Sequence, residues 1–262
     1  MKSATFILST VLLISVLAFS SCQKVIDINL NDSNPQFIIE ANIANDSAPC
    51  VVDISKSTNF NQSNNFPEVT NALVTLSDDA GNSEDLQMTA NGHYTSSTIM
   101  GVEGRIYTLN VNVDGKTFKA VSSLPYKTNL DSLWVDSLSL FGRNTYSVFP
   151  QYKDSISVPN YYRFKLFVNG TLDKTIFLED DAFTDGRTVI LPLFGEIEIK
   201  TGDILRLQMM CIDKPVHLFF FSLASVQNGS TGAPANPVSN FTGGCLGYFS
   251  AHTFQEKTLV VK

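Results

Sequence analysis

Apolar and polar residues alternate along several short segments of the chain, and two of these segments end at a two-residue turn. From Tyr107 to Val113 every second residue is apolar, and Asp114-Gly115 separates this run from a second one at Phe118–Val121. A period of two places one set of side chains on one face of a β-strand. Because Asp-Gly favours the tight turn between antiparallel strands, the pattern predicts a β-hairpin.

The same reasoning predicts a second hairpin and six further strands. Tyr162–Val168 alternates, Asn169-Gly170 supplies the turn, and Leu172–Leu178 returns. The other segments are short, rich in β-branched or aromatic residues, and separated by turn residues. They are Phe37–Ile43, Cys50–Ser55, Ala72–Ser77, Val189–Leu193, Ile204–Ile212 and Thr258–Val261.

One segment has helical spacing instead. Val216, Phe220 and Leu223 share one face of a helix, Pro215 stands at its first turn, and Gly229 follows its end. Proline near the start and glycine past the end are typical of helices. The run Phe219–Phe221 is equally compatible with a buried strand, so both interpretations stay open.

These elements predict a mainly β protein of two antiparallel β-sandwich domains, with one short helix in the C-terminal domain. The chain has 262 residues, 44% of them hydrophobic and 16% charged, which is enough apolar material for a sizeable core. A composition change around Ser123–Asn129 places one domain at residues 36–123 and the other at 130–262. The formal net charge of -7 argues against a nucleic acid partner.

The first residues have the order of a signal peptide. Lys2 precedes an apolar run from Ala4 to Phe19, and small residues then lead to Cys22. This arrangement resembles a bacterial lipobox, so we expect residues 1–21 to be a signal peptide, Cys22 to carry lipid, and residues 22–35 to be a lipidated tether. The alternative is an ordinary signal peptide with an incidental cysteine. In either case the apolar run is shorter than a transmembrane helix requires.

The remaining cysteines and the histidines give no support for a cofactor or a metal centre. Cys50, Cys211 and Cys245 allow at most one disulfide, and none has zinc-site spacing. Cys211 occupies the apolar half of an alternating run, which indicates a core thiol. The sequence does not decide whether a disulfide forms among the three.

Two loops are candidates for binding. Asp180, Asp181 and Asp185 follow a predicted strand and are a weak candidate for Ca²⁺, the alternative being a solvated acidic turn. The Gly, Ser, Asn and Pro content of residues 228–237 predicts an exposed loop, and exposed loops commonly carry binding contacts. The alternative is a simple connection. The residues of this possible partner-binding loop are Asn228, Gly229, Asn236 and Asn240.

Several motifs in the N-terminal half resemble a known type of sandwich. They are Ala72-x-Val74-x-Leu76, Gly92-x-Tyr94 and Tyr107-x-Leu109-x-Val111. Their alternation and turn glycines are similar to those of the transthyretin-like or carboxypeptidase-regulatory-like fold, which belongs to the immunoglobulin type.

The whole arrangement is more specific. After Cys22 come Lys24-Val25-Ile26-Asp27, the strand Phe37–Glu40, and the late segments Asn236–Asn240 and Gly243–Phe249. This order resembles the Bacteroidota lipoprotein family called domain of unknown function 4249. The resemblance implies an outer-membrane lipoprotein that assists a SusC-like TonB-dependent transporter, and it carries over no catalytic residue.

We therefore expect a non-catalytic accessory or ligand-capturing lipoprotein, anchored by lipid in the outer membrane. A surface adhesin or structural lipoprotein is the alternative, and a hydrolase is a distant third. The sequence leaves open the cargo, the oligomeric state, glycosylation, and whether the protein faces the periplasm or the cell surface.

Overall fold

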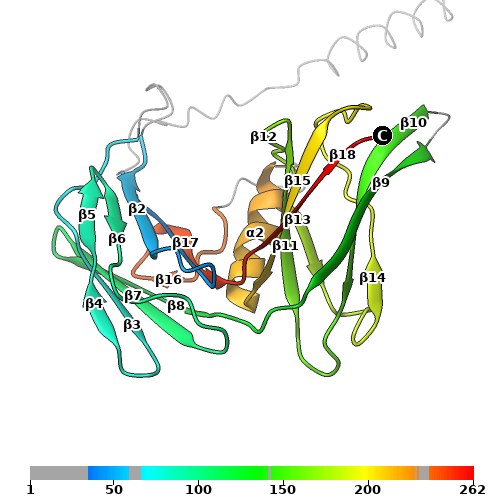
Figure 1. Cartoon of the computed structure of the whole chain (residues 1–262). Helices are drawn as coiled ribbons and strands as arrows, with labels where there is room; N and C mark the ends of the chain where they lie inside the picture. Colours follow the sequence, from blue (N-terminus) through cyan, green and yellow to red (C-terminus); the bar gives the residue numbers. More distant parts are fainter. Residues whose placement is uncertain (1–34, 59–65, 141–142, 228, 230–235) are drawn as a thin grey trace, which may run out of the picture. The chain divides into compact units, whose positions relative to one another are not determined.

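Four β-sheets and one helix make up the described part of the chain (Figure 1). The computed structural model describes residues 35–58, 66–140, 143–227, 229 and 236–262, all of which cluster as one unit. The strands pair antiparallel except for β1 with β17, so the mainly β prediction is confirmed. Within the described ranges, no helix has the length and apolarity needed to cross a bilayer.

The first sandwich consists of two five-stranded sheets whose inward side chains form one core cluster. Strand burial alternates as a sheet with one face inside requires, for example along β7 (Ile106–Val113). One sheet has the order β17 (Leu246–His252), β1 (Phe37–Ala44), β2 (Val51–Lys56), β6 (His93–Thr95), β5 (Gln87–Ala90). The other has the order β16 (Phe241–Thr242), β8 (Lys116–Ser123), β7, β3 (Leu73–Asp78), β4 (Ser83–Asp85).

The second sandwich encloses a separate core cluster, to which Tyr152, Tyr162 and Phe164 contribute large buried rings. Its smaller sheet has the order β14 (Thr188–Ile190), β10 (Arg143–Lys153), β9 (Leu130–Leu140). Its larger sheet has the order β12 (Thr171–Leu172), β11 (Tyr161–Val168), β15 (Ile204–Ile212), β18 (Gln255–Val260), and β13 (Phe177–Asp180) also pairs with β11.

Both predicted hairpins are present. Asp114 and Gly115 have φ values of 50° and 71°, and Asn169 and Gly170 have 51° and 83°. Two successive residues with positive φ are what a type I′ turn requires, and Asn, Asp and Gly tolerate that conformation best. The turns therefore join β7 to β8 and β11 to β12.

The second hairpin differs from its prediction in one respect, because its returning strand is interrupted. Between β12 and β13, the buried Asp173 carboxylate accepts hydrogen bonds from the backbone N–H groups of Thr175 (2.9 Å) and Ile197 (2.8 Å). These hydrogen bonds hold the pKa of Asp173 below its ordinary value although burial opposes the shift. The buried charge diverts the chain before β13 resumes pairing with β11.

The helix α2 (Lys214–Gln227) confirms the helical interpretation of its segment over the strand alternative. The Asp213 carboxylate accepts a hydrogen bond from the Val216 N–H at 3.0 Å, which caps the first turn. Val216, Phe219 and Phe220 are buried against β11, β15 and β17 in a third core cluster. Gly229, with φ of 62°, follows the helix as predicted.

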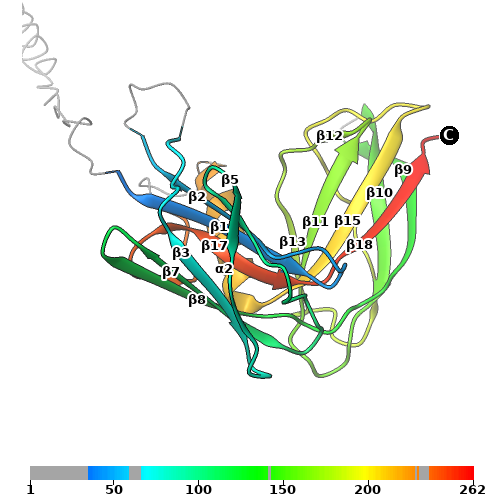
Figure 2. The same ribbon diagram turned by 60° about the vertical axis from the view of Figure 1, so that its left-hand side comes forward.

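The sequence-based boundary assigned residues 241–252 to the C-terminal domain, and the strand pairing corrects this assignment. β16 pairs with β8, and β17 pairs in parallel with β1, so the chain returns to the first sandwich (Figure 2). Gly247 makes the return possible, because a Cβ there would lie 2.0 Å from the Ile39 carbonyl oxygen. The local pattern of these residues contains no sign of their distant partner strands.

Candidate functional site

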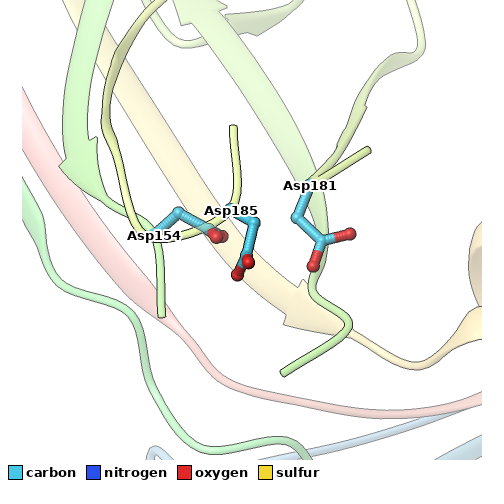
Figure 3. Close-up of side chains that lie close together, drawn as sticks. All are labelled: Asp154, Asp181 and Asp185. Carbon is cyan, nitrogen blue, oxygen red and sulfur yellow. The ribbon is translucent and has the colours of Figure 1, made fainter. Parts of the chain in front are cut away.

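Three carboxylates meet at one end of the second sandwich. Asp154 directly follows β10, and Asp181 and Asp185 lie in the connection from β13 to β14. One ligand oxygen from each residue lies within 4.8 Å of the other two. Figure 3 shows the Asp185 side chain between those of Asp154 and Asp181.

This cluster corrects the predicted calcium candidate by one residue. Asp181 and Asp185 belong to it, whereas Asp180 is replaced by Asp154. Asp180 is the last residue of β13, and its carboxylate accepts a hydrogen bond from the Ala182 N–H at 3.1 Å. Successive side chains of an extended chain point in different directions, so Asp180 and Asp181 do not share a site. Asp154 is far away in sequence and was missed for that reason.

Each carboxylate in the cluster already accepts hydrogen bonds. Asp154 is buried, and it accepts from the Tyr162 hydroxyl and from the Gly186 N–H, the latter at 3.2 Å. Burial and this hydrogen bond to Asp154 both raise the pKa of Tyr162, so the phenol remains the donor. The connection from β10 to β11 is thereby fastened to the connection from β13 to β14.

The other two members of the cluster, the half-buried Asp181 and the exposed Asp185, join the same two loops. The Asp185 carboxylate accepts from the Ser157 N–H at 2.6 Å, and that of Asp181 accepts from the Asn160 N–H at 3.1 Å. Three carboxylates are fewer ligands than the six to eight oxygens that Ca²⁺ takes, so an ion here would need further oxygens. The role visible in the hydrogen bonds is structural, since the carboxylates join loops 154–160 and 181–187.

The predicted partner-binding loop is described only at its ends. Asn228 lies outside the described residues, Gly229 ends the helix region, and Asn236 is exposed. Asn240 has a framework role, because its side-chain amide donates to the Phe249 carbonyl (2.7 Å) and accepts from the Phe249 N–H (3.0 Å). The end of the loop is thus pinned to β17.

A charged contact that sequence reasoning missed lies where α2 covers β11. The Arg163 guanidinium stands 3.5 Å from the centre of the Phe220 ring, and burial lowers the pKa of Arg163 while Tyr248 opposes the shift. Glu40, which pairs with Tyr248 across β1 and β17, has a pKa raised first by burial and then by Asp53. Arg163 belongs to the polar half of the alternation in β11, and the helix covers part of that face.

The cysteines within the described ranges are packing residues. Cys50, Cys211 and Cys245 are buried free thiols, and no disulfide joins them. Burial raises the pKa of the Cys50 and Cys245 thiols to about 12, so both remain protonated at neutral pH. The core position predicted for Cys211 is confirmed, whereas the predicted lipid site Cys22 lies outside the described residues.

Comparison with family models gives a match over most of the chain. The model of a family described as a domain of unknown function (DUF4249) matches residues 23–258. A search of curated proteins found no match. The matched range includes the first sandwich, the helix, and the second sandwich except the last two residues of β18.

Proposed function

Because the chain belongs to the DUF4249 family, we propose that it is a lipid-anchored outer-membrane protein that assists a SusC-like TonB-dependent transporter by binding. The observation that carries the proposal is where the family match begins. Residue 23 directly follows Cys22, the cysteine that the apolar leader and the lipobox-like sequence point to. The family match therefore begins one residue after the expected start of the processed chain.

The β-rich fold supports an accessory role distinct from that of SusD-type partners, which are mostly helical. Two sandwiches offer loops on a rigid framework, and such loops are common sites of recognition. Within this proposal the protein is not an enzyme, requires no cofactor, and contacts the membrane through lipid on Cys22.

The anchor is tested by replacing Cys22 with alanine. The variant should leave the membrane fraction, because each acyl CH₂ contributes about 0.8 kcal/mol of membrane affinity. It should also lose labelling by a fatty-acid probe, because the thiol that would carry the lipid is absent. Cys245→Ala is the matched control, since this cysteine is buried in the first core and should leave membrane association unchanged. Unchanged membrane association of the Cys22 variant would refute the anchor.

The partner is tested by purifying the native lipoprotein and identifying the outer-membrane proteins that accompany it. Deleting Gly229–Ala235 should weaken recovery of the transporter while folding and lipidation stay intact, because the pinned contacts of Asn240 lie outside the deletion. A Gly-Ser linker of the same length separates the effect of sequence from that of length. Full recovery of the transporter with both variants would exclude the loop as its binding surface. Absence of any transporter from the purified lipoprotein would favour the adhesin alternative.

A further inference from the structure

Loops 154–160 and 181–187 present large apolar side chains to solvent at the same end of the second sandwich. Ile156 is 73% exposed, Val158 53% and Phe183 90%. Gly186 lies directly against Ile156, because a Cβ on this glycine would stand 3.1 Å from the Ile156 Cβ. We call Ile156, Val158 and Phe183 the apolar tip.

The backbone beneath the apolar tip is held in place by hydrogen bonds. The Ser157 N–H donates to the Asp185 carboxylate at 2.6 Å, and Ser157 has a positive φ of 61°. The Asn160 side-chain amide donates to the carbonyls of Ser155 (3.2 Å) and Val158 (2.5 Å). A surface already held in one conformation loses little further conformational entropy when it binds.

A rigid apolar tip in water points to a partner. Single exposed apolar residues are ordinary, but several on two loops that hydrogen bonds hold together commonly mark an interaction site. Fully burying a side chain such as Ile or Phe is worth about 1.5–3 kcal/mol. The second sandwich keeps these three residues outside its core cluster.

The charges around the tip indicate the chemistry of that partner. Asp180, Asp181 and Asp185 border Phe183 in sequence, and the two loops contain one basic residue, Arg187. These three aspartates, which we call the acidic rim, attract lysine and arginine side chains. They are repelled by an anionic lipid surface, which attracts basic segments instead.

We propose that the apolar tip is a docking surface for a partner protein with an apolar pocket bordered by Lys and Arg side chains. Phe183 enters the pocket as the anchor, and the exposed residues Asp180 and Asp185 face the basic residues. The carboxylate cluster fixes the two loops so that the anchor and the rim meet the partner together. This inference does not require the partner to be the transporter.

The test uses the full-length lipoprotein in its native host, with the photoreactive amino acid p-benzoylphenylalanine in place of Phe183. Irradiation should join the protein to one partner protein, and the cross-linked peptide of that partner should contain apolar residues next to Lys or Arg. Ile156→Ser should lower the yield of this adduct about tenfold, as expected beside a binding hot spot. Washing the membranes in 0.5 M NaCl, which shortens the range of electrostatic attraction, should lower the yield further.

The matched control places the same photoreactive residue at Tyr126, which is 75% exposed and lies outside both loops. The purified Ile156→Ser variant should keep its thermal unfolding midpoint, because its side chain is mostly in solvent. The proposal is overturned by equal adducts from both positions, by adducts only with lipid or a second copy, or by a partner peptide without basic residues. An adduct with a protein other than a transporter supports the docking surface while contradicting the proposed function.

Discussion

The Ser122 hydroxyl, near the end of β8, donates a hydrogen bond of 2.9 Å to the carboxylate of Asp213, which directly precedes α2. The same Ser122 oxygen accepts a hydrogen bond from the Ala251 N–H of β17, also at 2.9 Å. One buried hydroxyl therefore connects three segments that are distant in sequence. Burial raises the pKa of Asp213, although hydrogen bonds from the Ser123 N–H, the Val216 N–H and the Ser122 hydroxyl oppose the shift.

Ser122→Ala should destabilise the protein by about 1–3 kcal/mol, because it leaves the Ala251 N–H without its buried acceptor and removes one of the two hydrogen bonds to the same Asp213 oxygen. Ser123→Ala is the control, since Ser123 contacts Asp213 through its backbone N–H alone. Urea unfolding followed by circular dichroism measures both variants. Equal stabilities of the two variants would contradict this role of Ser122.

The Glu84 carboxylate should make stability depend on pH. It accepts hydrogen bonds from the backbone and hydroxyls of Ser97 and Thr98 and from the Ile99 N–H. Burial opposes ionisation, but these donors outweigh it and lower the pKa of Glu84 to about 2. The stabilisation is therefore present above the ordinary value of 4.5 and is lost as the pH falls toward 2.

Glu84→Gln should consequently unfold at a lower temperature than the parent protein above pH 4.5, and the difference should shrink as the pH falls. Thermal unfolding midpoints between pH 2 and 7 provide the measurement. Glu68→Gln, at an exposed position, should show little difference at any pH. A difference for Glu84→Gln that is constant with pH would argue against the charged carboxylate as its cause.

Gly247→Ala should be far more damaging than Gly244→Ala. Both glycines have positive φ, at 97° and 83°, so both variants incur the backbone strain of that region. A Cβ at Gly244 meets open space, whereas one at Gly247 lies 2.0 Å from the Ile39 carbonyl oxygen. For Gly244→Ala we expect the free energy of unfolding to fall by about 1 kcal/mol. For Gly247→Ala we expect a much larger fall or failure to fold. Soluble yield and urea unfolding compare them.

Asp154→Asn should loosen the joined loops of the second sandwich. The variant replaces one carboxylate oxygen by an NH₂ group, so the hydrogen bonds from Tyr162 and Gly186 cannot both remain. We expect a loss of about 1–3 kcal/mol in urea unfolding. Asp136→Asn, on an exposed position of β9, should change stability by less than about 0.5 kcal/mol. A similar result for both variants would show that the Asp154 contacts contribute little.

Sequence reasoning succeeded where the signal is local. Asp114-Gly115 and Asn169-Gly170 specify their turns by backbone conformation alone, and Pro215 with Gly229 marks the limits of the helix. The burial of Cys211 follows from a period-two pattern in one strand. In each case the residues that carry the signal also form the structure.

Prediction from the sequence failed where segments that are distant along the chain come together in the fold. Asp154 and Asp181 come together only because β10 and the β13–β14 connection end on the same side of the second sandwich. β9 and β10 form a long hairpin that was not predicted, in part because Asp131 and Asp136 interrupt its apolar pattern. The apolar tip was missed because exposure is a property of the folded surface.

The return of β17 to β1 has a consequence for the order of folding. Phe249 and Ala251 are fully buried in the core of the first sandwich, yet in the chain they come after strands β9 to β15 of the second sandwich. Without β17 the N-terminal strands have an unfilled core and an unpaired edge at β1, so the first sandwich cannot finish folding until most of the second sandwich has followed it along the chain.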